Sequence, residues 1–123
     1  MIIATSIAET REAISRWRGD GCSIGLVPTM GYFHDGHLEL MRASVGQSAK
    51  TVVSLFVNPT QFGPEEDLEV YPRDLEGDCA KASQVGVDLV FSPDPNEIYR
   101  SGHQTEILLA GLASGLCACL LYT

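Results

Sequence analysis

The sequence predicts an α/β domain built on a parallel sheet. Short apolar runs of strand length alternate with segments whose apolar residues recur at helical spacing. Two of these runs, residues 24–27 and 50–57, are joined by a helical segment, and such a βαβ unit places its two strands parallel. A length of 123 residues suits one domain with a modest core.

The chain begins with a short apolar segment, residues 1–5, which we expect at the edge of the sheet. Ser6 followed three residues later by Glu9 forms a capping-box pattern, so a helix is predicted to start there. It should run to about Arg18 and stop at the glycines that follow. Its expected apolar side consists of Ile7, Ala13, Ile14 and Trp17.

The next unit is a strand over residues 24–27, a turn over 28–33 and a helix from Gly36 to about Gly46. The expected apolar stripe of this helix is Leu38, Leu40 and Met41. The first N–H groups of a helix have no partners within it, and the helix dipole places partial positive charge there. A strand, a glycine-bearing turn and a helix start together predict an anion site.

Two histidines, His34 and His37, stand at this helix start with a spacing that puts both on one face. Imidazole N–H groups are good donors to phosphate oxygens, and Gly36 between them leaves room for a ligand. Two other interpretations stay open: ordinary polar surface residues, or half of a zinc site. A zinc site needs further ligands, and the nearest cysteine, Cys22, precedes the strand.

Residues 50–57 read as a fully buried strand, because most of them are apolar and many are β-branched. The turn 28–33 and the loop 58–62 each follow a strand of the same sheet, so the two should face one crevice. Asn58 begins the second loop with turn chemistry. The amide of Gln61 suits a small polar substrate, and Phe62 could form a wall of its pocket.

The remaining elements continue the alternation. A helix is predicted over residues 75–85, with Gly86 as its C-terminal cap, and a third buried strand over 87–91. The prolines in residues 92–95 interrupt the chain, and one helical turn is expected over 96–99. His103 is interpreted as a surface residue.

The composition limits the possible partners. The net charge is −8, from 16 acidic and 8 basic residues, whereas a nucleic-acid-binding surface needs a basic patch. No run reaches the roughly 18–20 apolar residues of a membrane span, and the N-terminus lacks the layout of a signal peptide. The cysteines show neither paired zinc spacing nor a dense disulfide framework, which favours free thiols in the cytoplasm. These cysteines are Cys22, Cys79, Cys117 and Cys119.

Several short sequence motifs, called words below, follow one another in a characteristic order along the chain. They are Pro28-Thr29-Met30-Gly31, His34-Asp35-Gly36-His37, Phe56-Val57-Asn58-Pro59-Thr60-Gln61-Phe62-Gly63, Glu66-Asp67-Leu68, Tyr71-Pro72-Arg73, Val87-Asp88-Leu89-Val90-Phe91 and Glu97-Ile98-Tyr99. The histidine word resembles the HIGH-type signature of nucleotidyl-transfer enzymes. Together, over about residues 7–113, the words resemble the pantothenate synthetase (pantoate–β-alanine ligase) family.

This resemblance implies a Rossmann-like nucleotidyltransferase domain of the HIGH type. The implied reaction condenses pantoate with β-alanine, uses ATP and Mg²⁺, and passes through a pantoyl-adenylate intermediate, giving pantothenate, AMP and diphosphate. The family also implies a homodimer.

The resemblance assigns roles to particular residues. His34 and His37 would act in catalysis by holding ATP phosphates, and His37 resembles the proton donor. The implied ATP-binding segment is Met30, Gly31, Tyr32, Phe33, His34, Asp35, Gly36 and His37. The implied pantoate and β-alanine contacts are Gln61, Asn58, Pro28, Thr29 and Phe62. Asp78 falls where some relatives place a magnesium-linked carboxylate; the alternative is a solvated helix face.

The family continues beyond these words with an Arg-Pro-Gly-His-Phe word, a lysine–aspartate segment and a smaller C-terminal domain, none of which this sequence contains. We therefore expect a truncated domain over residues 1–113 with an atypical tail over 114–123, and weak or no activity. The run 108–121 is apolar, and Cys117 and Cys119 are interpreted as incidental. Two alternatives stay open: a catalytically silent nucleotide- or pantoate-binding module, and another small nucleotidyltransferase such as a phosphopantetheine adenylyltransferase.

Overall fold

A computed structural model describes residues 1–62 and 71–105 of the chain. Within these two stretches, β1 (Ile2–Ala4), β2 (Ile24–Thr29), β3 (Lys50–Leu55) and β4 (Leu89–Phe91) form one sheet in the order β1-β4-β3-β2. Every neighbouring pair is parallel. The predicted parallel α/β fold and the edge position of the N-terminal segment are therefore confirmed.

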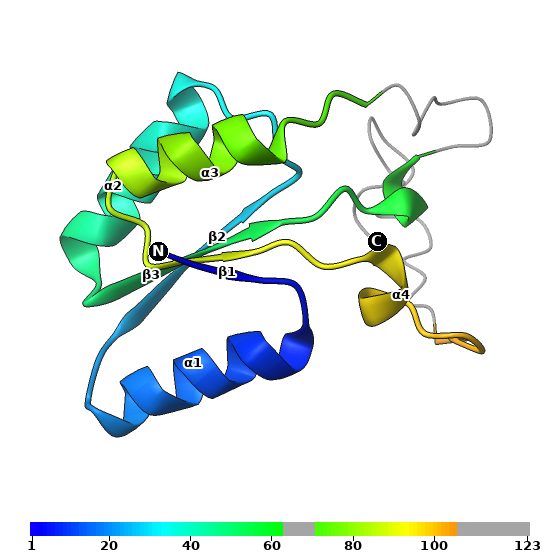
Figure 1. Cartoon of the computed structure of the whole chain (residues 1–123), viewed down its shortest axis with the longest axis horizontal. Coiled ribbons are helices and arrows are strands. Elements are labelled where there is room, and N and C mark those ends of the chain that lie inside the picture. The colour runs from blue at the N-terminus through cyan, green and yellow to red at the C-terminus, as the bar shows by residue number, and fades with distance from the viewer. Residues whose placement is uncertain (63–70, 106–123) are drawn as a thin grey trace, which may run out of the picture.

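Helices cover both faces of this sheet (Figure 1). Helix α1 (Ile7–Gly19) lies on one face, and α2 (Asp35–Gln47) and α3 (Leu75–Gln84) lie together on the other. The short 3₁₀ helix η1 (Pro59–Gln61) follows β3, and the single turn α4 (Pro95–Ile98) follows β4. Both short helices lie beyond the carboxyl ends of the strands, where parallel sheets of this kind bind ligands.

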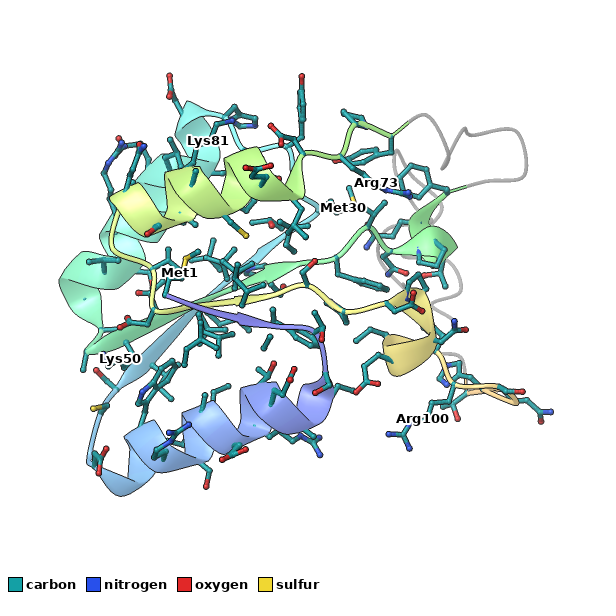
Figure 2. The ribbon with its side chains drawn as sticks, viewed as in Figure 1. Met1, Met30, Lys50, Arg73, Lys81 and Arg100 are labelled. Carbon is teal, nitrogen blue, oxygen red and sulfur yellow. The ribbon has the colours of Figure 1, made fainter. Side chains whose placement is uncertain are left out.

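The sheet separates two apolar clusters, one on each of its faces (Figure 2). Two successive residues of β3 belong to different clusters. Val53 lies in the cluster beneath α2 and α3, whose buried members are Val27, Phe33, Met41, Val53, Cys79, Ala82, Val87 and Val90. Val52 lies in the cluster beneath α1, with Ala4, Ala13 and Leu89. A strand buried on both faces explains why its sequence shows a continuous apolar run instead of alternation.

Helix α1 begins as its sequence predicts. The Ser6 hydroxyl accepts from the backbone N–H of Glu9, and the Glu9 carboxylate accepts from the N–H groups of Thr5 and Ser6. Ala13 is buried, and Ile14 and Trp17 pack against the α1-side cluster. The predicted capping box is therefore confirmed, and so is the apolar side at these three residues, whereas Ile7 is half-buried and does not pack against the cluster.

Several predicted boundaries move by one to two residues. Strand β2 extends through Pro28 and Thr29, which were expected in the turn; β2 is an edge strand among the described residues, and an edge tolerates proline. Strand β3 stops at Leu55 because its neighbours end, β2 opposite Leu55 and β4 opposite Ser54. Phe56 therefore leaves the ladder after one last hydrogen bond, from its N–H to the Thr29 carbonyl.

The later boundaries also shift by one to two residues. Strand β4 begins at Leu89, two residues after the predicted start at Val87. Helix α3 ends at Gln84, and Gly86 adopts a left-handed φ of 92° just beyond it, as a C-terminal glycine should.

The expected apolar stripe of α2 is wrong in one position. Met41 is fully buried and Leu38 packs against the core, whereas the side chain of Leu40 is 59% exposed. Residues three apart share a helix face, and Leu40 is only two residues from Leu38, so it points away from the sheet.

Some sequence-based expectations lie outside the described residues. These are the boundary at residue 113, the tail 114–123, the apolar run 108–121, the cysteines Cys117 and Cys119, Gly63 at the end of its word, and the word Glu66-Asp67-Leu68. Within the described residues Cys22 and Cys79 are free thiols, and no helix there has the length and apolar character needed to cross a membrane.

Candidate active site at the carboxyl ends of the strands

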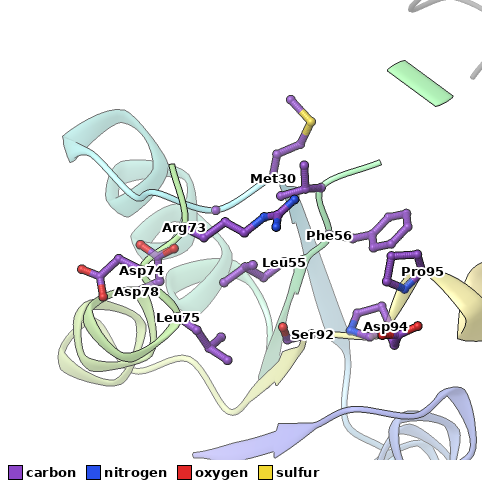
Figure 3. A pocket seen from close by; sticks show the side chains of 13 residues that line it. Met30, Leu55, Phe56, Arg73, Asp74, Leu75, Asp78, Ser92, Asp94 and Pro95 are labelled. Carbon is purple, nitrogen blue, oxygen red and sulfur yellow. The ribbon is translucent and has the colours of Figure 1, made fainter. Parts of the chain in front are cut away.

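A cavity of about 300 Å³ opens at the carboxyl ends of β2, β3 and β4, beside the start of α3 (Figure 3). It lies where a parallel sheet is expected to bind its ligand. Its lining residues are Met30, Gly31, Leu55, Phe56, Val57, Arg73, Asp74, Leu75, Asp78, Ser92, Pro93, Asp94 and Pro95.

The turn 28–33 reaches the predicted crevice, but the loop 58–62 does not line it, and the residues that line it after β3 had been predicted as part of the strand. Met30 and Gly31 enter the cavity from the end of β2, and Phe56 and Val57 enter it from the end of β3. The expected pantoate contacts Asn58, Gln61 and Phe62 are not among its lining residues. They follow in η1 and its caps, further along the same loop.

The turn after β2 has an unusual backbone. Gly31 has φ of 91°, and a Cβ there would lie 3.1 Å from a methyl of Leu55 and 3.2 Å from a carboxylate oxygen of Asp78. Tyr32 also has a positive φ, 55°, which is uncommon for a residue with a side chain. Glycine is therefore required at position 31 both by conformation and by space.

The side chains of this turn point in opposite directions. The ring of Tyr32 is 57% exposed, whereas the ring of Phe33 is 3% exposed and belongs to the core beneath α2 and α3. Phe33, expected within an ATP-binding segment, therefore places its side chain in the core and not at the surface.

Helix α3 holds this turn through two of its side chains. The two carboxylate oxygens of Asp78 accept the backbone N–H groups of Tyr32 at 2.6 Å and Phe33 at 2.7 Å. One helical turn further on, the Lys81 ammonium donates to the Phe33 carbonyl at 2.8 Å. Asp78 is 1% exposed, so the alternative that it lies on a solvated helix face is wrong.

The two histidines cap helix α2. The Nδ1 atom of His34 accepts from the backbone N–H of Gly36 at 3.1 Å, and Nδ1 of His37 accepts from the backbone N–H of His34 at 3.3 Å. Because an accepting nitrogen carries no proton, this pattern assigns each ring proton to Nε2 in the neutral form. The two ring centroids are 4.1 Å apart. Two Nε2–H donors are thus presented side by side at a helix start.

The ring of His37 favours its neutral form. Burial lowers the pKa of His37 below its ordinary value of 6.5, and the neighbouring His34 lowers it further, while the Asp78 carboxylate acts in the opposite direction. A neutral imidazole at neutral pH is a hydrogen-bond donor through Nε2 and not a fixed positive charge.

Two of the expected substrate contacts, Pro28 and Thr29, lie at the end of β2. Pro28 is exposed on the edge strand, and the Thr29 hydroxyl donates to the carbonyl of Ser54 at 2.8 Å. Thr29 therefore ties β2 to β3 at the point where both strands end.

The loop after β3 is organised around one oxygen. The side-chain carbonyl of Asn58 accepts the backbone N–H of Thr60 at 3.1 Å and the Thr60 hydroxyl at 2.9 Å. It also accepts the phenolic O–H of Tyr99, 2.9 Å away, from the segment after α4. Gln61 follows half-buried at the end of η1, and the ring of Phe62 meets Tyr71 edge-on at 5.5 Å.

The charged groups around the cavity do not form a metal cage. Each acidic side chain of the cavity accepts from backbone N–H groups. Both oxygens of Asp78 do so, Asp74 accepts from the N–H of Gly77, and Asp94 accepts from the N–H of Asn96. Among residues 1–62 and 71–105, no three histidine, cysteine or acidic side chains are grouped so as to hold a metal ion. This donor set does not fit an Mg²⁺ cage, and it gives His34 and His37 no further partners for zinc.

Sequence reasoning missed several residues of this site. The segment 92–95 follows β4 and enters the cavity, which the rule that sites lie at strand ends could have shown. Arg73 also lines the cavity, whereas the basic residues Arg42 and Lys50 lie elsewhere, paired with Glu39 and Asp88. The contacts of Lys81 and Tyr99 join segments about 40 residues apart or more, and no local pattern reveals them.

A family model and individual relatives all relate this chain to one family. The model of the family described as "Pantoate-beta-alanine ligase" matches residues 2–120. A pantothenate synthetase of Pelotomaculum thermopropionicum is 50% identical over 117 residues, which is 95% of this chain and 42% of that protein. A pantothenate synthetase of Rhodospirillum rubrum is 46% identical over 115 residues, which is 94% of this chain and 41% of that protein. The chain thus spans less than half the length of these relatives.

Solved structures give the same picture. The crystal structure of pantothenate synthetase from Thermus thermophilus superposes with a TM-score of 0.84 at 43% identity, over 94% of this chain and 40% of that one. A pantoate-beta-alanine ligase from Francisella tularensis, complexed with Beta-gamma ATP and Beta-alanine, superposes with a TM-score of 0.82 at 34% identity. That match covers 92% of this chain and 43% of the Francisella chain.

Proposed function

This chain belongs to the pantoate-beta-alanine ligase family, and we propose that it carries the nucleotide and pantoate sites of a pantothenate synthetase. The observation that supports this best is the pair of imidazole Nε2–H donors, 4.1 Å apart between ring centroids, at the start of α2. Such a pair can hold two phosphate oxygens while the helix dipole stabilises their charge.

In the proposed first step a carboxylate oxygen of pantoate attacks the α-phosphorus of ATP. The bond from that phosphorus to the oxygen bridging the α- and β-phosphates breaks, diphosphate leaves with the electron pair, and pantoyl adenylate remains. His34 and His37 hold the phosphates and stabilise the negative charge that develops on them. The lowered pKa of His37 favours its neutral ring, which donates through Nε2–H.

Pantoate is proposed to lie beside the loop 58–62. Gln61 is half-buried at the end of η1, and its side-chain amide offers two donors and an acceptor suited to the hydroxyls of an acid substrate. Asn58 fixes the loop through its carbonyl, and Pro28, Thr29 and Met30 border the adjoining strand end.

In the second step the amine of β-alanine attacks the acyl carbon of the adenylate. The bond from the acyl carbon to the phosphate oxygen breaks, AMP leaves, and the amine gives up its proton as the amide forms. The described residues offer no cage for the Mg²⁺ that the family resemblance implies, so no step is assigned to it.

The wider properties of the family belong to the same proposal. A second copy of the chain is proposed as a partner; Ile3 of β1 is 53% exposed and Leu26 of β2 is 64% exposed on the two outer strands of the sheet that the structure describes. The free thiols Cys22 and Cys79 support a reducing, cytoplasmic location.

The test is single-turnover chemistry combined with binding. The chain is mixed with ATP and pantoate without β-alanine, and pantoyl adenylate is measured after acid quench; affinities for pantoate and a non-hydrolysable ATP analogue are measured by calorimetry. Adenylate formation supports the proposal. Binding of both ligands without adenylate supports a silent binding module, and nucleotide binding without pantoate binding supports another nucleotidyltransferase.

Gln61→Ala makes this test specific. It should weaken pantoate binding while leaving the affinity for the ATP analogue nearly unchanged, because a site built to bind hydroxyls loses its selectivity when its polar partner is removed. An equal loss for both ligands would contradict the assignment of Gln61.

A further inference from the structure

The carboxylate of Asp78 is engaged by the backbone of the turn after β2. Its Oδ2 accepts from Tyr32 at 2.6 Å and its Oδ1 accepts from Phe33 at 2.7 Å. Both distances are short for N–H donors to oxygen, as expected where the acceptor is charged. The side chain is 1% exposed, so these two N–H groups replace the water that a carboxylate would otherwise require.

The turn has the shape of an anion-binding nest. Gly31 and Tyr32 have successive positive φ values of 91° and 55°, and the consecutive N–H groups of Tyr32 and Phe33 each bond one oxygen of the same carboxylate. In many proteins such a nest holds a phosphate. Here a carboxylate of the same chain, 46 residues away from Tyr32, already lies in it.

A second side chain of α3 completes the contact. Lys81 is three residues after Asp78, on the same helix face, and donates to the Phe33 carbonyl at 2.8 Å. Phe33 therefore has its N–H and its carbonyl bound to one helix, while its ring lies in the core. We call the pair Asp78 and Lys81 the α3 clamp.

The clamp determines which groups remain for a phosphate. The N–H groups of Tyr32 and Phe33 are occupied, whereas the imidazoles that follow present Nε2–H. The Phe33 ring lies 5.6 Å from the His37 ring between centroids, so a fixed Phe33 also fixes the direction of that imidazole.

The donors around Asp78 do not suit a divalent metal. Mg²⁺ requires oxygen ligands in a nearly ideal octahedron, usually one or two carboxylates with waters and phosphates. Both oxygens of Asp78 point at N–H groups, and no cluster of three ligating side chains includes it among the described residues.

We propose that Asp78 is a positioning residue and not a magnesium ligand. Together with Lys81 it locks the turn 31–33, fills the nest, and leaves nucleotide phosphates to the Nε2–H groups of His34 and His37. The last of these consequences rests on the proposed function; the clamp itself does not.

The first arm of the test measures the clamp without any ligand. Amide hydrogen exchange by ¹⁵N NMR is followed at Tyr32 and Phe33 in the wild-type chain and in Asp78→Asn, which puts an NH₂ against one of the two N–H groups. Exchange at both amides should accelerate about tenfold or more. Asp74→Asn is the matched control, because asparagine still caps α3, and exchange at Tyr32 and Phe33 should not change. Unchanged exchange in Asp78→Asn would overturn the clamp.

The second arm tests the metal on the wild-type chain, so it does not depend on a variant that folds. Mn²⁺ alone is titrated as a paramagnetic probe of Mg²⁺ sites. The amides of Tyr32, Phe33 and Cys79 should broaden no more than amides elsewhere. Selective broadening of these amides would show a metal at Asp78 and overturn the proposal.

The third arm measures affinity for a non-hydrolysable ATP analogue with Mg²⁺ and with excess EDTA. Asp78→Asn and Lys81→Met should each weaken binding by the same factor in both conditions, because the clamp acts on the turn and not on the metal. Weakening by Asp78→Asn only when Mg²⁺ is present would favour a metal ligand and overturn the proposal. A wild-type chain that binds no nucleotide would contradict the proposed function, while the exchange arm would still decide the clamp.

Discussion

The phenolic hydroxyl of Tyr99 donates to the side-chain carbonyl of Asn58 across 2.9 Å and 41 residues of sequence. This bond joins the segment after β4 to the loop after β3, and the Tyr99 ring also lies 6.3 Å from that of Phe56 between centroids. The same Asn58 oxygen accepts from Thr60, so three donors fix the loop that carries Gln61. Tyr99 is therefore placed to hold the loop that carries Gln61.

Tyr99→Phe should weaken pantoate binding about two- to tenfold and leave the affinity for an ATP analogue unchanged. The substitution removes one hydrogen bond and keeps the ring contacts with Phe56 and His103. Calorimetry with each ligand checks this split. A parallel loss of affinity for both ligands would point to a general loss of structure instead.

His34 combines a capping role with a proposed catalytic one, and two substitutions separate them. His34→Ala removes the cap and the imidazole, so it should cost about 0.5–2 kcal/mol of stability as well as activity. His34→Asn keeps a good N-cap and removes only the imidazole, so its unfolding midpoint should stay near that of the wild type. Adenylate formation should fall about 10²–10³-fold in both. Full activity in a stable His34→Asn would contradict the phosphate role.

Stability should fall as the pH drops from about 7 to 5. Burial lowers the pKa of His37 in the folded chain below its value near 6.5 in the unfolded chain, so the unfolded state binds more protons in this range. The contribution is fully present above pH 6.5 and is lost as the pH falls through the lowered pKa. Urea midpoints at pH 8, 7, 6 and 5 should show this decline, and His37→Gln should flatten it.

A second acidic transition should be distinguishable from this one. Backbone N–H groups of Thr5 and Ser6 lower the pKa of Glu9 below 4.5. The contribution of ionised Glu9 to stability is therefore lost only in more acidic solution than that of His37. A decline between pH 7 and 5 that persists unchanged in His37→Gln would assign the effect to another group.

Gly31→Ala should destabilise the fold by roughly 1–3 kcal/mol. Alanine would have to adopt a φ of 91° and place its Cβ 3.1 Å from Leu55 and 3.2 Å from Asp78. Gly46→Ala is the matched control, because Gly46 lies inside α2 with open space around it and should gain about 0.5–1 kcal/mol. Thermal unfolding of both variants measures the contrast, and equal midpoints would show that the turn relaxes around the methyl group.

The sequence by itself determined those features that depend on neighbouring residues. The Ser6–Glu9 capping box, the helix after His34 and the alternation of apolar runs with helical segments are local patterns, and each reappears in the structure. The rule that ligands bind beyond the carboxyl ends of parallel strands then placed the turn 28–33 at the cavity, although the loop 58–62, predicted to face the same crevice, does not line it. Ordered words along the chain were enough to indicate the family.

Only the tertiary structure decided the features that depend on a distant partner. Apolar runs show that a strand is buried but not which strand lies beside it, so the pairing of β1 with β4 could not be read from them. The end of β3 at Leu55 was set by where its neighbours end, although its own apolar run continues. The burial of Asp78 is the clearest case. A carboxylate on a helix is ordinarily solvated, and only the N–H groups of Tyr32 and Phe33, brought to it by the fold, make its burial favourable.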